Sequence, residues 1–199
     1  MKRFRSWVAF FVSAVVALSL SLFSIRAGAD QQTQIDNLRD ALSIIENTLW
    51  ATHRSDLSNA ETRQNGLDTT AYSPSQWDTW FAADDALFSE QAVLEEDLSA
   101  HQLLQRVKED DGDGEIDIVR DLLDIAEEMV SNGDDASVQI AWAAERTSDF
   151  IDDCETAQAR IALGLIELNS LIALIVPAAP PVAQTGTGTS VADARALLP

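Results

Sequence analysis

The sequence predicts an all-α protein, an antiparallel bundle of about four helices. Apolar residues recur at three- and four-residue spacing over most of the chain beyond residue 30, which is the period of one helix face. Asn-Gly and Ser-Pro pairs at 65–66 and 73–74 mark a loop between two such stretches. The ~170 residues that follow residue 29 suffice for one domain with a sizeable core.

The first 29 residues have the pattern of a secretory signal. Basic side chains open the chain, an apolar run covers 7–22, and Ala-Gly-Ala stands at 27–29. We expect residues 1–29 to be a signal peptide that is cleaved before Asp30, so that the protein is exported to a periplasm or the exterior. An uncleaved membrane anchor is the alternative.

The charge restricts the partners. Residues 1–29 hold four of the 13 basic side chains and no acid, so the remaining chain carries 9 basic against 33 acidic residues, a net charge of −24. Such a surface repels nucleic acid and anionic lipid headgroups, and it attracts divalent cations or basic partners. An acidic, lysine-poor composition is equally expected of a protein made for high salt.

Two helices are expected in the first half of the chain. The first covers about 31–63, with an apolar stripe, and a loop at 64–75 follows. The second begins near Gln76, and its apolar side includes Trp77, Trp80, Phe81, Leu87, Phe88, Leu94 and Leu98. The three aromatic residues near its start are expected in the core or as a lid on the bundle end, with a ligand-binding cluster as the alternative.

A break is expected near Ser99 in this second helix. The apolar stripe changes phase beyond Leu98, and Ser99 with Gln102 forms the S-x-x-Q pattern of a capping box, which starts helices. A short helix should then lead into an acidic loop at 109–121, and another helix over about 116–131 should follow it.

This acidic loop is the segment whose residue order points to a specific chemistry. Glu109, Asp111 and Asp113 alternate, Gly114 follows, and Ile116 stands where an aliphatic is needed. Calcium prefers six to eight oxygen ligands on a loop with a glycine at its turn. The segment therefore resembles an EF-hand loop, and the resemblance implies a single calcium site and a helix–loop–helix around it.

Two departures from the EF-hand pattern concern the ends of the loop. The first ligand is Glu109 where the family has Asp, and Arg120 occupies the position of the closing acid. A loop one residue longer makes Asp121 the closing acid. The predicted ligands are Glu109, Asp111, Asp113, Glu115, Asp117 and Asp121. The alternative is a plain acidic turn whose carboxylates favour the positive N-terminus of the next helix.

A long last helix is expected between the Asn-Gly-Asp-Asp turn at 132–135 and Pro177. Its apolar stripe holds helical spacing for about ten turns. The end at 161–176 is apolar nearly all round and is expected to be buried core, with a surface for self-association as the alternative. The bundle domain should cover 30–176, and 177–199 should be a flexible Pro/Gly/Thr-rich tail with a short helix over 191–198.

No catalytic motif is apparent, so the protein is expected not to be an enzyme. Cys154 lies on the apolar stripe and is expected as a buried core thiol, while His53 and His101 are expected at the surface. The leading hypothesis is an exported, acidic, calcium-responsive interaction or structural module. The alternative is a metal-independent helical scaffold that associates through its last helix, with a protein partner or a second copy. A bundle that holds a small ligand or metal comes third.

Overall fold

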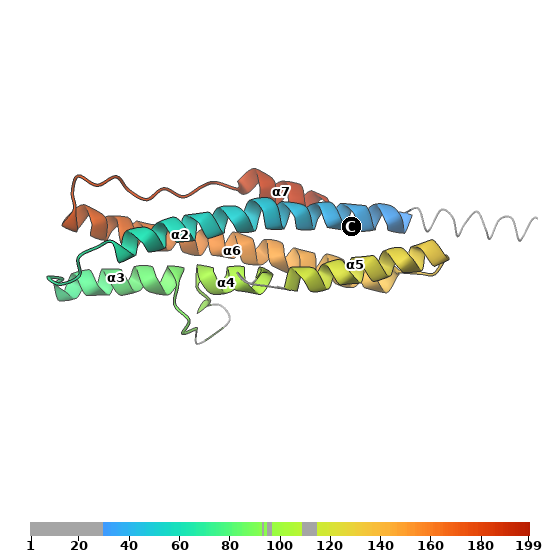
Figure 1. Ribbon diagram of the computed structural model, residues 1–199, viewed down its shortest axis with the longest axis horizontal. Coiled ribbons are helices and arrows are strands. Elements are labelled where there is room, and N and C mark those ends of the chain that lie inside the picture. The colour runs from blue at the N-terminus through green and yellow to red at the C-terminus, as the bar shows by residue number, and fades with distance from the viewer. Residues whose placement is uncertain (1–29, 93, 95–96, 109–114) are drawn as a thin grey trace, which may run out of the picture.

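The computed structural model describes residues 30–92, 94, 97–108 and 115–199, and these contain helices and no strands (Figure 1). The predicted all-α class is confirmed. The predicted signal peptide at 1–29 lies outside the described residues. The elements are a helical stretch at 30–44, η1 Ile45–Trp50, α2 Ala51–Asn65, α3 Pro74–Leu87, α4 Ala100–Val107, α5 Glu115–Asn132, α6 Ser137–Ile175 and α7 Gly188–Ala196.

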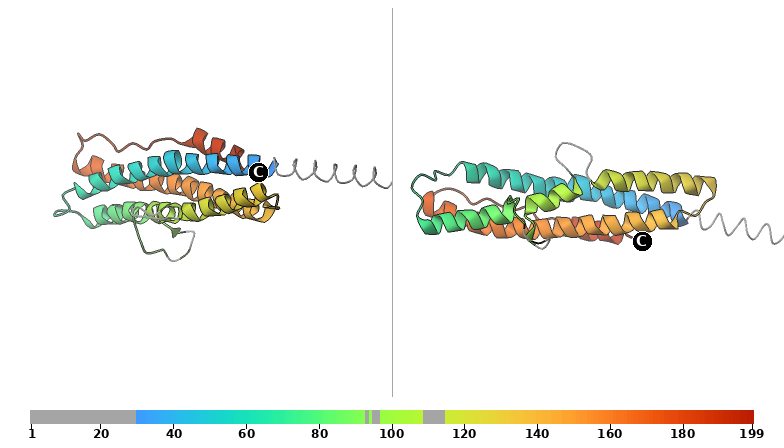
Figure 2. Two further views of the ribbon diagram at one scale, coloured as in Figure 1. Left: turned by 45° about the vertical axis from the view of Figure 1, so that its right-hand side comes forward. Right: turned by 90° about the horizontal axis from the view of Figure 1, so that it is seen from below.

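These elements form three rods that lie side by side. Residues 30–65 make the first rod without a break, the second consists of α3, α4 and α5 in succession, and α6 is the third (Figures 1 and 2). The described residues contain six labelled α-helices, so the helical class is confirmed and the expected count of about four helices is not. α6 contacts η1 and each of the other labelled helices, so it is the spine of the bundle.

The first rod contains one irregular turn, the π-helix η1. Its backbone keeps Ile45 and Leu49 in the core, while Glu46 is held toward the second rod. π-Helical turns inside α-helices are uncommon and occur often at functional sites. In this chain the turn places an acidic side chain opposite the two ends of the acidic loop.

The second predicted helix ends earlier than expected. We expected it to continue from Gln76 to Leu98, but α3 ends at Leu87, and the backbone N–H groups of Phe88 and Ser89 both donate to the Asp84 carbonyl, at 2.7 and 3.0 Å. The predicted capping box is confirmed: the Ser99 hydroxyl accepts from the Gln102 N–H and α4 starts there. A connection therefore separates the end of α3 at Leu87 from the start of α4 at Ala100.

The turn between α5 and α6 follows the sequence. Gly133 has φ of +81°, its N–H donates to the Val130 carbonyl, and the Asp134 N–H donates to the Met129 carbonyl. This is the Schellman arrangement, which needs a left-handed residue that glycine adopts without strain. The predicted helix end at 132–133 is thus confirmed.

The apolar end of α6 is divided between core and surface. The predicted stripe is buried at Ile161, Leu165, Leu168 and Ile172. The expectation of core all round is wrong for the outward side, where three more large side chains are exposed: Leu163, Ile166 and Leu174. In the described part of the chain, α3 borders Leu163 and Ile166 but leaves both side chains exposed. Among the described residues, α6 is also the one helix long and apolar enough to cross a membrane.

Residues 177–199 lie along the bundle. Expected as a flexible tail, they run back beside the first rod (Figure 1), where Val182 exchanges two hydrogen bonds with the Asn169 side chain at 2.8 and 2.9 Å. The expected short helix at 191–198 is α7, and its Val191 and Ala194 are buried. The tail therefore adds apolar surface to the core of the domain.

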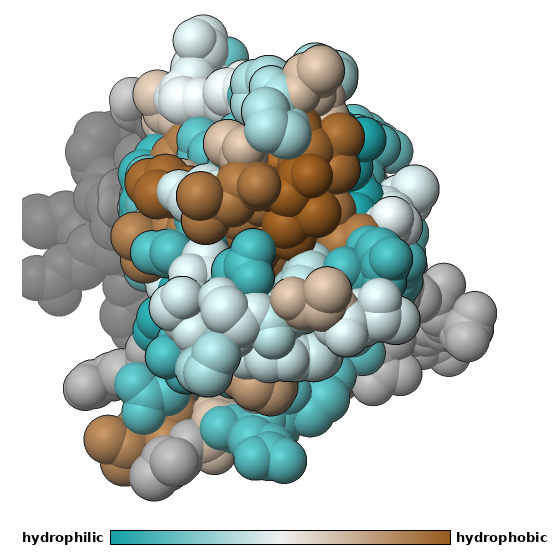
Figure 3. Space-filling view, turned by 90° about the vertical axis from the view of Figure 1, so that its left-hand side faces the viewer, coloured by the Kyte–Doolittle hydropathy of each residue, from teal (hydrophilic) through white to brown (hydrophobic). Residues whose placement is uncertain are grey.

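Apolar surface also gathers at one end of the molecule. Figure 3 shows the end at which α3 begins and α6 ends, with a broad apolar area. Leu174 and Val176, both exposed, belong to this end of α6. The outward side of α6 thus continues into the end of the bundle.

Candidate functional site

Half of the predicted calcium ligands can be placed in the structure. Glu109, Asp111 and Asp113 lie outside the described residues. Glu115, Asp117 and Asp121 lie in the first two turns of α5, where Glu115 and Asp121 are exposed and Asp117 is half-buried. Their carboxylates are at the N-terminal end of the helix, as both the calcium-loop and the acidic-turn readings require.

Two of these three carboxylates have cationic neighbours. The Arg120 guanidinium donates to Asp117 Oδ1 at 2.7 Å, and Arg146 Nη1 lies 3.8 Å from Glu115 Oε2. A cation in the loop would compete with these two guanidinium groups for the same oxygens. Nowhere in the described part of the chain do three or more His, Cys, Asp or Glu side chains gather closely enough to hold a metal.

Arg120 of α5 and Lys108 both bind Glu46 of η1. Lys108, just before the loop, donates to Glu46 Oε1 at 2.6 Å, and Arg120 donates to Glu46 Oε2. The hydrogen bond from Lys108, aided by Arg120, lowers the pKa of the Glu46 carboxyl against the opposing effect of burial. The Lys108 ammonium also lies 5.3 Å from the centroid of the Trp50 ring, a distance suited to a cation–π contact.

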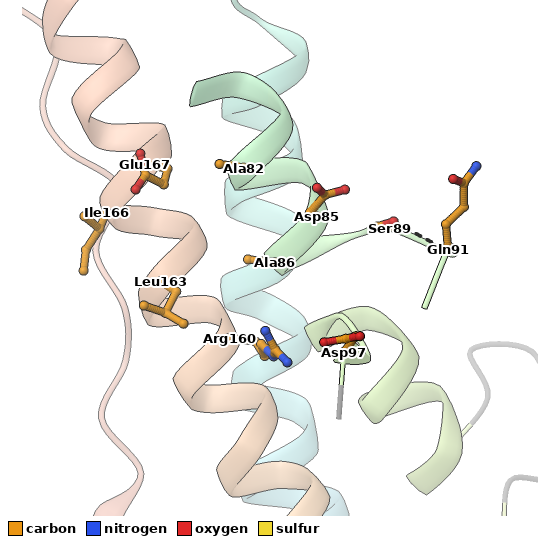
Figure 4. A pocket seen from close by; sticks show the side chains of 10 residues that line it. All are labelled: Ala82, Asp85, Ala86, Ser89, Gln91, Asp97, Arg160, Leu163, Ile166 and Glu167. Atoms are coloured by element: carbon orange, nitrogen blue, oxygen red, sulfur yellow. Dashed lines mark hydrogen bonds between the residues drawn. The ribbon is translucent and has the colours of Figure 1, made fainter. Parts of the chain in front are cut away.

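A second feature is a groove of about 580 Å³ between α3 and α6 (Figure 4). On the α3 side the wall has the small side chains Ala82 and Ala86, while α6 contributes Leu163 and Ile166. Both large α6 side chains are largely exposed, by 55% and 61%.

Charged groups border this groove on both sides. Asp85 on α3 and Asp97 on the connection after it form one edge, and Glu167 and Arg160 on α6 lie opposite (Figure 4). Three carboxylates against one guanidinium make the rim acidic. An apolar floor with an acidic rim is the complement of an amphipathic segment that carries basic residues beside apolar ones.

The aromatic residues at the start of α3 contact one another. Trp77 stacks on Phe81 with ring centroids 5.7 Å apart, and it also meets Tyr72 at 5.2 Å and Trp80 at 5.9 Å. Phe81 is 53% exposed, and neither tryptophan is fully buried. These rings therefore lie outside the buried core, so the expectation of core residues is wrong, and the lid and the ligand-binding cluster stay predictions.

The two histidines have different environments. His101 lies near Glu90, with Nε2 3.6 Å from Oε1. His53 was expected at the surface, and this was wrong: it is fully buried, next to the buried Asp56. Burial lowers the pKa of His53, although the nearby Asp56 carboxylate opposes the change. Thr185 and Thr187 of the tail supply polar groups around this pair, and no local pattern near His53 indicates them.

Comparison with protein-family models, with curated proteins and with solved structures found no match for this chain.

Proposed function

We propose that this chain is an acidic helical interaction module that binds a basic amphipathic helix of a protein partner in the groove between α3 and α6. The observation that carries this proposal is the exposure of Leu163 and Ile166 in a groove bordered by Asp85, Asp97 and Glu167. This proposal follows the alternative hypothesis from the sequence, a metal-independent helical scaffold that associates through its last helix. It adds that the binding surface lies on one side of α6.

The apolar floor supplies affinity. Full burial of a leucine or isoleucine side chain contributes about 1.5–3 kcal/mol. Leu163 and Ile166 are already partly covered, so a partner would gain a fraction of this at each. A helix bound in a groove presents apolar anchors at i, i+3, i+4 and i+7, and Leu163 and Ile166 are the large apolar side chains of the groove that such anchors would contact.

The charge selects the partner. With a formal net charge of −20 over the full sequence, two copies repel each other on approach, whereas a basic segment is attracted and its on-rate is raised. A basic amphipathic helix can pair its cationic side chains with the acidic rim and pack its apolar side chains on the floor of the groove. A second copy of this chain could pack apolar side chains on the floor, but its negative charge would be repelled by the acidic rim.

The test uses a synthetic amphipathic helix with leucines at i, i+3 and i+7 and lysines on the flanks. We expect Leu163→Ser with Ile166→Ser to weaken its binding at least tenfold by fluorescence anisotropy. The matched control is Ile118→Ser with Ile125→Ser, two comparably exposed residues on α5, which should bind as the wild type does. Equal loss in both double variants would reject the groove.

The peptide also needs controls. A scrambled peptide of the same composition keeps the charge and loses the apolar face, so its binding measures non-specific attraction. We expect it to bind weakly and to lose that binding in high salt, because screening removes long-range attraction. If it binds as well as the amphipathic peptide, charge alone is being measured and the docking site is refuted.

Calcium binding by 109–121 is a second candidate function. What favours it is that Lys108, directly before the loop, and Arg120, in the second turn of α5, both bind Glu46, because fixing the chain on both sides of a loop lowers the entropy lost when the loop closes around an ion. The predicted ligands are still Glu109, Asp111, Asp113, Glu115, Asp117 and Asp121. The pairing of Asp117 with Arg120 favours weak binding.

A further inference from the structure

The tail that follows α6 is attached to the first rod by buried polar groups. Asp56 of α2 is only 2% exposed, and its carboxylate accepts two hydrogen bonds from Thr185: one from the backbone N–H at 2.8 Å and one from the hydroxyl at 3.0 Å. Gln184 adds a hydrogen bond to the Gln158 carbonyl of α6 at 2.7 Å. These contacts hold the tail against both α2 and α6.

Thr187 continues this attachment toward His53. Its hydroxyl donates to Gln158 Oε1 at 3.0 Å, and its oxygen lies 3.5 Å from His53 Nε2. Since the hydroxyl proton is given to Gln158, Thr187 can only accept from the imidazole, which places the ring proton on Nε2. His53 Nδ1 is then an unprotonated nitrogen, buried and without a hydrogen-bond partner in the described part of the chain.

A second proton on His53 has no place in this arrangement. It would create a buried N–H donor with no acceptor and a charge shielded from water, and both are costly. The charged group that acts on His53 is Asp56 on its own helix. From the tail, Thr187 lies against the imidazole, while Gln158 of α6 bonds to Thr187 and Thr185 bonds to Asp56, and none of these three side chains titrates.

We propose that residues 177–199 form an acid-released latch: when the pH falls, His53 takes up a proton and the tail detaches from α2 and α6. Detachment uncovers the face of η1 and α6 that contacts α7 and on which Val191 and Ala194 are buried. The latch is independent of the groove between α3 and α6, so either proposal can fail alone.

The direction with pH follows from linkage. The attached tail binds neutral His53, and the detached state leaves this residue hydrated, with the ordinary pKa of 6.5. The latch is therefore fully present above pH 6.5 and weakens as the pH falls below it. At pH 5 an imidazole with this pKa is mostly protonated, so the open fraction rises by at most about 30-fold.

The Thr185 amide proton reports the latch directly, because it is bonded to Asp56. We expect its hydrogen-exchange protection, measured by NMR and corrected for intrinsic rates, to fall by about 10- to 30-fold between pH 7.5 and pH 5. An amide in the buried middle of α6, such as that of Ile151, exchanges through global unfolding and should stay much more protected than Thr185 at both pH values. This comparison separates local release from global unfolding.

The variant His53→Gln keeps a polar group near Thr187 and cannot gain a proton. In it, Thr185 protection should be the same at both pH values. If the variant loses protection as the wild type does, other groups drive release and the proposal is refuted. The wild-type imidazole provides a test without any variant: a His53 that is protonated at pH 5 while Thr185 stays fully protected would equally overturn it.

Discussion

The side chain of Leu87, at the end of α3, lies directly against Gly164 of α6. A Cβ on residue 164 would come within 2.7 Å of Leu87 Cδ2 and closer still to Cγ. Both residues are buried. Glycine in the middle of a helix is itself unfavourable by about 1 kcal/mol relative to alanine, so its presence here reflects the close approach of the two helices.

We expect Gly164→Ala to destabilise the protein. The added methyl group gains about 1 kcal/mol of helix propensity, but forcing Leu87 or α3 to move costs typically 1–3 kcal/mol. The net loss should be about 0–2 kcal/mol in chemical denaturation. Gly186→Ala is the control, because a Cβ there meets nothing within 4 Å. A more stable Gly164→Ala protein would contradict the close approach.

The division of the α6 end into two sides can be tested within one helix. Leu165→Ala and Leu168→Ala remove buried side chains and should each cost about 2–5 kcal/mol. Leu163→Ala removes a side chain that is 55% exposed and should cost much less, about 0.5 kcal/mol. Similar losses at positions 163 and 165 would show that the outward side is covered in solution.

Asp153 should make the folded state sensitive to pH. It lies within α6, with Oδ2 3.6 Å from Arg106 Nε, and burial outweighs this partner and raises its pKa to about 6. A carboxyl whose folded pKa is above its unfolded value destabilises the fold when ionised, so stability should fall as the pH rises from about 4 through 6.

The variant Asp153→Asn removes this titration. Relative to the wild type it should gain about 1–3 kcal/mol in unfolding free energy between pH 5 and pH 7.5, measured by urea denaturation at both values. An identical pH dependence in wild type and variant would mean that Asp153 ionises in the fold as readily as in the unfolded chain.

Calcium binding predicts a specific change in melting. A single site of about 0.1–1 mM affinity, as in extracellular modules, stabilises the fold by roughly 0.4–1.4 kcal/mol at about 1 mM free calcium. The melting curve is recorded in calcium and in chelator at matched ionic strength, so that general screening of the acidic surface is equal in both.

The loop is identified by two aspartate variants. Asp113→Ala should abolish the calcium-specific shift, and Asp85→Ala, on α3, should leave it. If the wild type and Asp113→Ala respond alike, residues 109–121 are only an acidic turn at the start of α5.

Local signals in the sequence predicted much of this fold. The capping box at Ser99 and the glycine at 133 act through neighbouring backbone groups. The apolar stripe of α6 has helical spacing, which indicates a helix whatever that stripe packs against. The end of α3 at Leu87 was not predictable in this way. The Leu87 side chain packs on Gly164, and no feature of residues 88–98 alone indicates where the chain must leave the helix.

The environment of His53 depended even more on distant residues. Its polar neighbour Thr187 is 134 residues away in the sequence, and a Pro/Gly/Thr-rich composition gives no sign of which surface it will lie on. The groove likewise arises from the two alanines of α3 facing the exposed side of α6. The sequence of each helix alone predicts an amphipathic helix. Only the packing of α3 beside α6 shows that Leu163 and Ile166 line a groove.

Because the tail runs back along the first rod, the end of the chain lies near the start of the first rod. α7 contacts η1, so the last residues of the chain come back toward the end of the bundle from which the stretch at 30–44 starts (Figure 1). Joining those two ends by a short peptide and opening the chain between Ser89 and Gln91 would leave every rod and its neighbours in place. A circular permutant of this kind would keep the arrangement of the helices in space. Its chain would begin with α4, so α4 rather than the first rod would leave the ribosome first.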